Sequence, residues 1–468
     1  MKSMPGWGEH AAAICGVLLL AALFVGLDAV FRRAPEPLWS LETPLAFVLL
    51  AAATQVLMAG TALRMKLVHF AETRQLVCIL GGIAVLALLA RYHHAIRRIA
   101  APLLVALLPV CAVTFGTSLY KAATHPALND PPHANPLQHA QGPRVLWIIF
   151  DEWDQRLTFD TRPTGLALPA LDRLRTESLF ATHALPPADS TIVSMPTLIE
   201  GRTVRHITPI DADTLLLEYN DGMKQRFGDE PNLFSEVRRS GMNAAAYGWY
   251  LPYCRIFAGQ LSDCWWQEMG TVWNSGGTSF ASALLTQPRA MLETSLFSPF
   301  GQSLTVLNHR RTYEELMQRS KRVAIDPDVQ FALVHFNVPH PPYIYDHASG
   351  QMTRSNSLSA YPDALALVDR TIGELRAHME QAGTWNSVIL LLSSDHFYRV
   401  SPLVNGARDQ RVPFLVHFPG QSAGLSYEPS FNTQLSHDLI LALLHSEVTD
   451  AASTEDWLNR HRQITSEQ

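Results

Sequence analysis

The chain has 468 residues, which is too many for one small hydrophobic core, so we expect two or three structural units. Charged residues make up only 17% of the sequence, because the first 120 residues are strongly apolar. The formal net charge is -6 and the sequence has no basic stripe, which excludes the usual nucleic-acid-binding proteins.

Four apolar segments open the chain. The first, second and fourth approach the ~20 residues that span a bilayer, and the third has no charge between Leu76 and Ala90. We therefore predict a four-helix transmembrane domain over residues 1–120, with a lipid membrane as partner. The segments cover residues 10–31, 43–63, 75–89 and 101–120.

The orientation of this domain follows weakly from the charged loops. With the first and third loops in the cytoplasm, the positive-inside rule is obeyed by a margin of about one residue. Cys254 and Cys264 favour the same orientation, because their spacing suits a local disulfide in an oxidising compartment. Two free thiols are the alternative. We expect a multi-pass protein of the bacterial inner (cell) membrane, with its C-terminal domain on the periplasmic or extracellular side.

Residues 121–143 are rich in proline and lack periodicity, which predicts an extended linker. Short apolar runs then alternate with helical patterns, and this alternation predicts an α/β domain over residues 144–448. We expect a mostly parallel central sheet with helices on both faces, followed by a polar tail over residues 449–468. The strand-like runs cover residues 145–150, 243–247, 331–336, 387–392 and 413–418. The helical patterns cover residues 167–177, 232–239, 311–322, 361–381 and 437–444.

The first strand-like run, in RVLWIIFDEW, is followed at once by Asp151 and Glu152. An unbroken apolar run is typical of a strand buried on both faces of a parallel sheet. Acids at the C-terminal end of such a strand lie where α/β sheets bind their ligands. The alternative is a buried strand whose acids only mark its exit to solvent.

Polar side chains also follow or precede three other elements. Thr191 lies near the start of a predicted helix, where free N–H groups and the helix dipole suit a phosphoryl group, although a simple N-cap is the alternative. His340 lies in a proline-flanked loop after a strand, whereas His335, inside that strand, is expected to be a core histidine. Asp395 and His396 end another buried strand and offer oxygen and nitrogen ligands suited to Zn²⁺ or Mn²⁺.

Together these motifs resemble the alkaline phosphatase superfamily, in its sulfatase-like branch, over roughly residues 144–445. RVLWIIFDEW resembles the first strand with its metal-binding acid, and STIVSMPTLIEGR resembles the nucleophile segment. VHFNVPHPPY resembles the histidine loop, LLSSDHF the second metal strand, and RVPFLVHFPG a late strand of the branch. All five motifs occur in the expected order.

The resemblance places Thr191 at the nucleophile position. A threonine cannot become formylglycine, Val193 and Met195 replace the sulfatase proline and arginine, and GWY replaces the sulfatase Lys–Trp–His element. These departures disfavour sulfate-ester hydrolysis. A threonine nucleophile instead resembles the membrane phosphoethanolamine transferases and the lipoteichoic acid synthases, which also carry N-terminal transmembrane helices.

The resemblance further implies one divalent metal ion, Zn or Mn, as cofactor. Such an ion would activate the nucleophile hydroxyl and neutralise charge on the phosphoryl oxygens. The implied ligands are Asp151, Glu152, Thr191, Asp395 and His396.

The resemblance also implies that His340 donates to the phosphoryl group or to the leaving oxygen. Arg408 and Arg411 stand where the transferases carry a further histidine, so we expect them to contact the substrate. Three hypotheses follow. The first is a phosphoethanolamine- or phosphoglycerol-type transferase acting on an envelope lipid or glycan, the second a hydrolase of phosphate or sulfate esters, and the third an inactive membrane protein of the same fold.

Overall fold

The computed structural model divides the chain into two compact units, which we describe separately. One unit comprises residues 129–269 and 306–468. The other comprises residues 4–128 and 270–305. The structure describes residues 7–31, 33, 43–45, 47, 75–124, 131–138, 142–210, 214–267, 280–281, 284–285, 303–355, 360–401 and 406–462.

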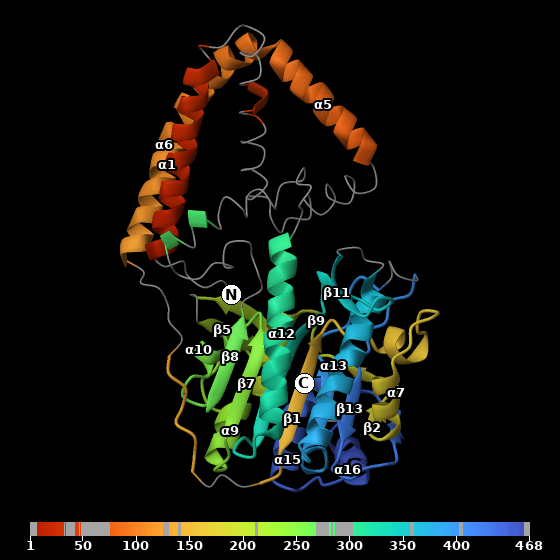
Figure 1. The fold of residues 1–468 in the computed structure, drawn as a ribbon. Coiled ribbons are helices and arrows are strands. Elements are labelled where there is room, and N and C mark those ends of the chain that lie inside the picture. Colours follow the sequence, from red (N-terminus) through yellow and green to blue (C-terminus); the bar gives the residue numbers. More distant parts are fainter. Residues whose placement is uncertain are drawn as a thin grey trace. The chain divides into compact units, whose positions relative to one another are not determined.

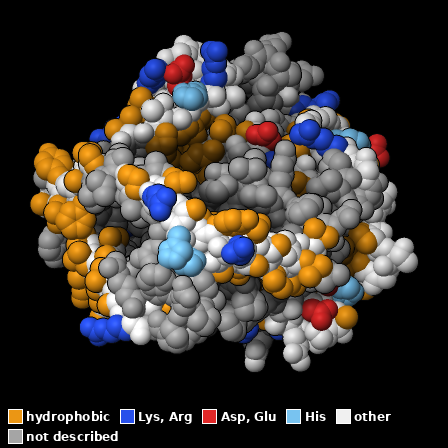
Figure 2. All heavy atoms as spheres, turned by 90° about the horizontal axis from the view of Figure 1, so that it is seen from above, with side chains coloured by type: hydrophobic (Ala, Val, Ile, Leu, Met, Phe, Trp, Pro, Cys, Tyr) orange, Lys and Arg blue, Asp and Glu red, His pale blue; other side chains and the backbone are white. Residues whose placement is uncertain are grey.

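The N-terminal unit contains the helices α1 (Trp7–Phe31), α5 (Gln75–Arg91) and α6 (His93–Thr124), of which α1 and α6 pack together. Many large apolar side chains of α1 and α5 are exposed, and hydrophobic side chains form broad patches in Figure 2. Within the described ranges, no helix is both long enough and apolar enough to cross a bilayer. The transmembrane domain over residues 1–120 stays a prediction, and its second segment lies mostly outside the described residues.

A mostly parallel sheet forms the centre of the larger unit (Figure 1). The strand order is β14-β2-β13-β12-β1-β9-β7-β8; β12, β1, β9, β7 and β8 are parallel, whereas β13 is antiparallel to both of its neighbours. Each predicted strand-like run overlaps one of these strands, which confirms the predicted α/β fold. The bounds are β1 (Val145–Asp151), β2 (Leu179–Ala181), β7 (Ala244–Trp249), β8 (Asp263–Gln267), β9 (Phe331–Pro339), β12 (Ile389–Ser394), β13 (Phe414–His417) and β14 (Leu425–Tyr427).

Helices cover both faces of this sheet, and the side chains of β1 show why its sequence is continuously apolar. Trp147 and Ile149 pack in the core beneath α8, α9, α15 and α16, whereas Ile148 and Phe150 pack in the opposite core beneath α7, α12 and α13. The bounds are α7 (Pro169–Thr176), α8 (Thr191–Glu200), α9 (Leu233–Arg239), α12 (Ser303–Ile325), α13 (Tyr361–Gln381), α15 (Ser436–Leu444) and α16 (Ala451–His461).

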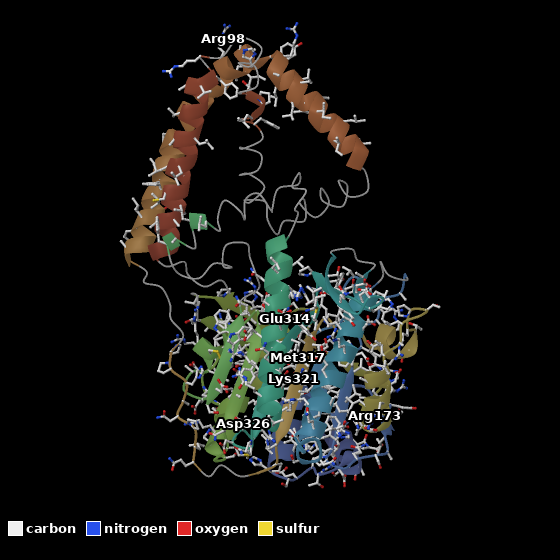
Figure 3. All side chains as sticks on the ribbon, in the orientation of Figure 1. Arg98, Arg173, Glu314, Met317, Lys321 and Asp326 are labelled. Atoms are coloured by element: carbon white, nitrogen blue, oxygen red, sulfur yellow. A yellow bond between two sulfur atoms is a disulfide. The ribbon has the colours of Figure 1, made fainter. Side chains whose placement is uncertain are left out.

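The helix α12 illustrates how the side chains fill these layers (Figure 3). Tyr313, Leu316 and Met317 are buried on one side of α12, at the spacing of an amphipathic helix. The Lys321 ammonium donates to the Glu374 carboxylate of α13 at 3.0 Å, which joins the two helices near the surface.

The shorter elements lie around the main sheet and were not predicted. The strands β4, β5 and β6 form a three-stranded antiparallel sheet, and β10–β11 and β3–β15 form small pairs. Their bounds are β3 (Ala184–Leu185), β4 (Val204–Pro209), β5 (Leu215–Tyr219), β6 (Lys224–Arg226), β10 (Tyr343–Asp346), β11 (Gln351–Ser355) and β15 (Phe431–Asn432). The short helices are η1 (Arg156–Asp160), α10 (Tyr253–Ile256), η3 (Trp385–Ser387) and η4 (Thr433–Leu435).

Two further features bear on the sequence predictions. Cys254 of α10 and Cys264 of β8 form a disulfide, which confirms the predicted pairing. The region expected to be a polar tail contains α16, because the Asp450 side chain caps the helix N-terminus and Trp457 and Leu458 are buried against the core.

Glu200, the last residue of α8, provides a test of this packing. Its side chain is buried, its contact with the Tyr219 hydroxyl is long at 3.4 Å, and burial raises the pKa of its carboxyl to about 8. The folded state thus keeps a proton that an unfolded glutamate releases near pH ~4.3. The stability that comes with this proton is complete below that pH and is lost as the pH rises through about 8.

We therefore expect Glu200→Gln to unfold like the wild type at pH 4 but to be more stable than the wild type by several kcal/mol at pH 9. Chemical denaturation at the two pH values measures the difference. Glu218→Gln, which changes a carboxylate paired with Lys224 at 3.1 Å, is the control and should show no gain at pH 9. An equal effect of Glu200→Gln at both pH values would contradict the interpretation.

Candidate active site

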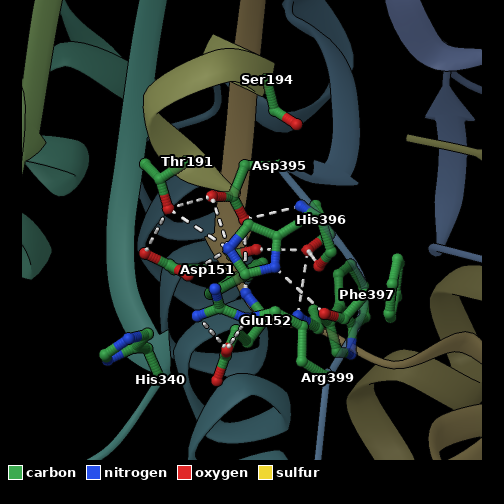
Figure 4. Close-up of polar contacts among 12 residues, drawn as sticks. Asp151, Glu152, Thr191, Ser194, His340, Asp395, His396, Phe397 and Arg399 are labelled. Atoms are coloured by element: carbon green, nitrogen blue, oxygen red, sulfur yellow. Dashed lines mark hydrogen bonds and ion pairs between the residues drawn. The ribbon is translucent and has the colours of Figure 1, made fainter. Parts of the chain in front are cut away.

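The strands β1 and β12 and the helix α8 bring four of the predicted site residues together at the C-terminal ends of the two strands (Figure 4). The strands β1 and β12 are parallel neighbours in which Phe150 is paired with Ser394, so the next residues, Asp151 and Asp395, lie side by side. Thr191 is the first residue of α8, and its side chain points toward both acids.

The contacts of Thr191 define a buried four-residue cluster with Asp151, Asp395 and His396. The Thr191 hydroxyl donates to Asp395 Oδ2 at 2.7 Å and lies 3.3 Å from both Asp151 Oδ2 and His396 Nε2. His396 Nε2 lies 3.6 Å from Asp151 Oδ1 and 3.5 Å from Asp395 Oδ2. The structure thus places four of the five predicted metal ligands within contact of one another.

This cluster fits a divalent cation. Two carboxylates and an imidazole offer ligand atoms that all lie within 4.8 Å of one another. His396 Nδ1 lies 3.0 Å from the Phe397 carbonyl, and a proton held there leaves Nε2 free to bind a metal. Burial, together with the charges of Asp395 and Glu152, raises the pKa of Asp151 well above its usual range, and Asp151 Oδ1 has no hydrogen-bond partner among the described residues. A bound cation would neutralise these acids and use that oxygen.

Glu152, the fifth predicted ligand, has a different partner. Its backbone has a left-handed φ of 64°, and its Oε1 accepts hydrogen bonds from Arg399 Nε at 3.0 Å and Nη2 at 2.8 Å. The Glu152 amide N–H donates to Asp395 Oδ1 at 3.3 Å. The carboxylate is not in the four-residue cluster, because the left-handed backbone directs the side chain to the arginine.

Two histidines of the predicted histidine loop lie beside the cluster. His340 is half-buried, its Nδ1 lies 2.6 Å from the Pro341 carbonyl, and its ring stands edge-on to Trp249 at 5.1 Å. Burial lowers the pKa of His340, which favours the neutral ring. His335 is buried as expected, but its Nε2 faces Asp151 Oδ2 at 4.0 Å and has no hydrogen-bond partner within the part of the chain that the structure describes.

The two predicted substrate arginines lie in different surroundings. The exposed Arg408 guanidinium lies 5.3 Å from the ring centre of Phe397, the residue after His396. Arg411 instead donates to Asp160 Oδ2 at 2.7 Å and to Asp409 Oδ1 at 3.1 Å, so it joins two loops. The structure brings Arg408 near the cluster and gives Arg411 a structural ion-pair network.

Arg399 and Tyr250 are site residues that the sequence reasoning missed. Arg399 pairs with Glu152, and Tyr250 follows β7 with a left-handed φ of 73°. Burial, followed by the charge of Asp151, raises the pKa of Tyr250, which places its hydroxyl in the field of the cluster. The available signals were the position of Arg399 shortly after His396 and the polar end of the β7 segment.

A mostly parallel α/β sheet whose strand ends hold two acids and a histidine around a helix-terminal threonine defines a metal-dependent enzyme of group-transfer or hydrolytic type. A family model described as Sulfatase matches residues 143–445, so the chain belongs to the Sulfatase family. This family consists of metal-dependent enzymes of the alkaline phosphatase superfamily, both hydrolases and transferases, as the sequence motifs predicted.

Parts of several solved structures also match the chain. The PsFucS1 sulfatase from Pseudoalteromonas sp. is 17% identical with a TM-score of 0.45, over 65% of this chain and 68% of that chain. The lipoteichoic acid synthase LtaP from Listeria monocytogenes is 14% identical with a TM-score of 0.41, over 65% and 72%. The phosphonate monoester hydrolase of Agrobacterium radiobacter is 15% identical with a TM-score of 0.40, over 65% and 77%. No curated protein sequence matches the chain.

Proposed function

We propose that this protein is a membrane-anchored, metal-dependent phospho-group transferase that uses Thr191 as its nucleophile. The observation that carries the proposal is the placement of the Thr191 hydroxyl, 2.7 Å from Asp395 and 3.3 Å from His396 at the N-terminus of α8. A free alcohol at a helix N-terminus suits attack on a phosphoryl group, because the helix dipole and free N–H groups favour the negative charge there.

The residues of the cluster support a two-step transfer. A divalent cation, Zn²⁺ or Mn²⁺, held by Asp151, Thr191, Asp395 and His396 would favour the alkoxide form of the threonine and neutralise phosphoryl charge. Thr191 Oγ1 loses its proton to the neutral ring of His340 and forms a bond to phosphorus, the bond from phosphorus to the leaving oxygen breaks, and His340 passes the proton on to that oxygen. An acceptor hydroxyl then attacks the phosphothreonine, loses its proton and releases Thr191 as a free alcohol.

Two features support an envelope substrate. The Cys254–Cys264 disulfide suits an oxidising compartment, which agrees with a domain on the periplasmic or extracellular side of the bacterial inner membrane. The exposed apolar side chains of α1 and α5 support a lipid membrane as partner, because contiguous apolar surface of this kind marks interaction sites. We therefore propose a phosphoethanolamine- or phosphoglycerol-type donor and a lipid or glycan acceptor.

The test uses the full chain in detergent, loaded with Zn²⁺ or Mn²⁺, and fluorescent phosphatidylethanolamine or phosphatidylglycerol as donor. We expect a covalent adduct that peptide mass mapping locates on Thr191, followed by transfer of the head group to an added lipid or glycan. Release of the free head group into water without transfer would assign the chain to the hydrolases. A protein that forms no adduct and consumes no donor would contradict both functions.

A further inference from the structure

We propose that Arg399 binds the anionic oxygens of the substrate phosphoryl group and that Glu152 is the positioning residue that holds Arg399 there. This inference deepens the proposed function and rests on phosphoryl chemistry at the four-residue cluster. It also gives Glu152 a role other than that of a metal ligand.

The contacts of the ion pair leave part of the arginine available. Arg399 directs both Nε and Nη2 at the single oxygen Oε1 of Glu152. Nη1 has no partner among the described residues, although a guanidinium offers five N–H donors in a planar fork. The Arg399 side chain is 44% exposed, whereas that of Glu152 is only 6% exposed, so the free edge of the fork can reach a ligand from solvent.

The backbone of Glu152 ties this pair to the cluster. Glu152 directly follows Asp151, its amide N–H donates to Asp395 Oδ1 at 3.3 Å, and its carbonyl accepts from the Tyr361 hydroxyl at 2.7 Å. Both backbone polar groups of Glu152 are therefore hydrogen-bonded, which fixes the residue whose carboxylate holds Arg399. Figure 4 shows Arg399 beside Glu152, below the cluster.

The charges of the site call for a cation at this position. Asp151, Glu152 and Asp395 are three buried carboxylates, and the charge of Arg399 acts on all three. A divalent cation together with Arg399 would balance them, so that an incoming phosphate meets no net negative charge. Arginine is well suited to this task because its fork binds phosphate oxygens with charge-assisted hydrogen bonds.

A purely structural role for Arg399 makes a different prediction, namely that its loss harms folding but not anion binding. The test titrates methylphosphonate, a phosphate analogue that cannot be transferred, into the Mn²⁺-loaded full chain in detergent by calorimetry. We expect Arg399→Met to weaken methylphosphonate binding by at least about tenfold with little change in Mn²⁺ affinity. Arg399→Lys should recover part of the affinity, and Glu152→Gln should give an intermediate loss.

Two further variants keep the experiment decisive. The double variant Glu152→Gln/Arg399→Met removes both charges together, so it avoids an unpaired buried carboxylate if the single variant fails to fold. Arg162→Met is the matched control, because Arg162 pairs with Asp172 at 2.9 and 2.6 Å outside the cluster.

Equal methylphosphonate affinity in the wild type, in Arg399→Met and in the double variant, or no binding by the wild type, would overturn the inference. A binding loss that depends on Arg399, in a protein that forms no adduct with any donor, would support this inference and contradict the proposed transferase. Failure of the Arg399 inference can therefore be distinguished from failure of the proposed transferase function.

Discussion

Replacement of Thr191 by alanine is expected to lower phospho-group transfer by at least about 10³-fold, because it removes the hydroxyl that is positioned to form the covalent intermediate. The Ser194 hydroxyl on the same helix cannot take its place, because it donates to the Ala188 carbonyl at 3.1 Å and points away from the acids (Figure 4). Asp151, Asp395 and His396 would still offer metal ligands, so we expect the variant to retain bound metal.

Adduct formation and transfer by Thr191→Ala can be measured with the fluorescent lipid donors described above. Thr191→Ser keeps an alcohol and should retain measurable activity. Thr197→Ala is the matched control on the same helix, because the Thr197 hydroxyl accepts a hydrogen bond from the Val204 amide and lies outside the cluster. Full activity of Thr191→Ala would show that the nucleophile has been assigned to the wrong residue.

Asp151→Asn is expected to have opposite effects on metal binding and on the stability of the metal-free protein. Loss of one carboxylate ligand should weaken metal affinity by about 100-fold and abolish activity. The same change removes a buried acid whose pKa is raised by burial and by Asp395, so the metal-free variant should be more stable than the wild type by about 1–3 kcal/mol.

Thermal unfolding with EDTA and with Mn²⁺ separates the two effects. A ligand at 100 times its Kd stabilises the wild type by about 2.7 kcal/mol, whereas the variant should gain far less at the same metal concentration. Asp154→Asn is the control: Asp154 is also fully buried, but its carboxylate accepts from the Leu157 amide and is not part of the cluster. A metal-dependent gain of equal size in Asp151→Asn would rule out Asp151 as a ligand.

The sequence predicts the centre of the sheet well because burial on two faces leaves a clear signal. The β1 run is apolar at every position for that reason, and β7, β9, β12 and β13 follow the same logic. The β6 strand, by contrast, has only three residues, Lys224–Arg226, and carries two basic side chains. Its conformation depends on pairing with β5, which no local pattern reports.

The candidate site, like the fold, could be predicted only in part from the sequence. Asp151, Asp395 and His396 follow buried strands and Thr191 begins a helix, so element boundaries alone bring them together. The role of Arg399 depends on the left-handed backbone of Glu152, which sets where that carboxylate points. Side-chain directions that depend on an unusual φ of a non-glycine residue cannot be read from hydrophobic periodicity.

The two-sided packing of β1 also limits how this enzyme can change in length. An insertion or deletion of one residue within Val145–Asp151 would exchange the side chains that face each core, since successive side chains of a strand point to opposite faces. The same slip would carry the carboxylate of Asp151 away from Thr191. Natural length variants of this enzyme should therefore keep the interval from Val145 to Asp151 constant and place their indels in the connecting loops.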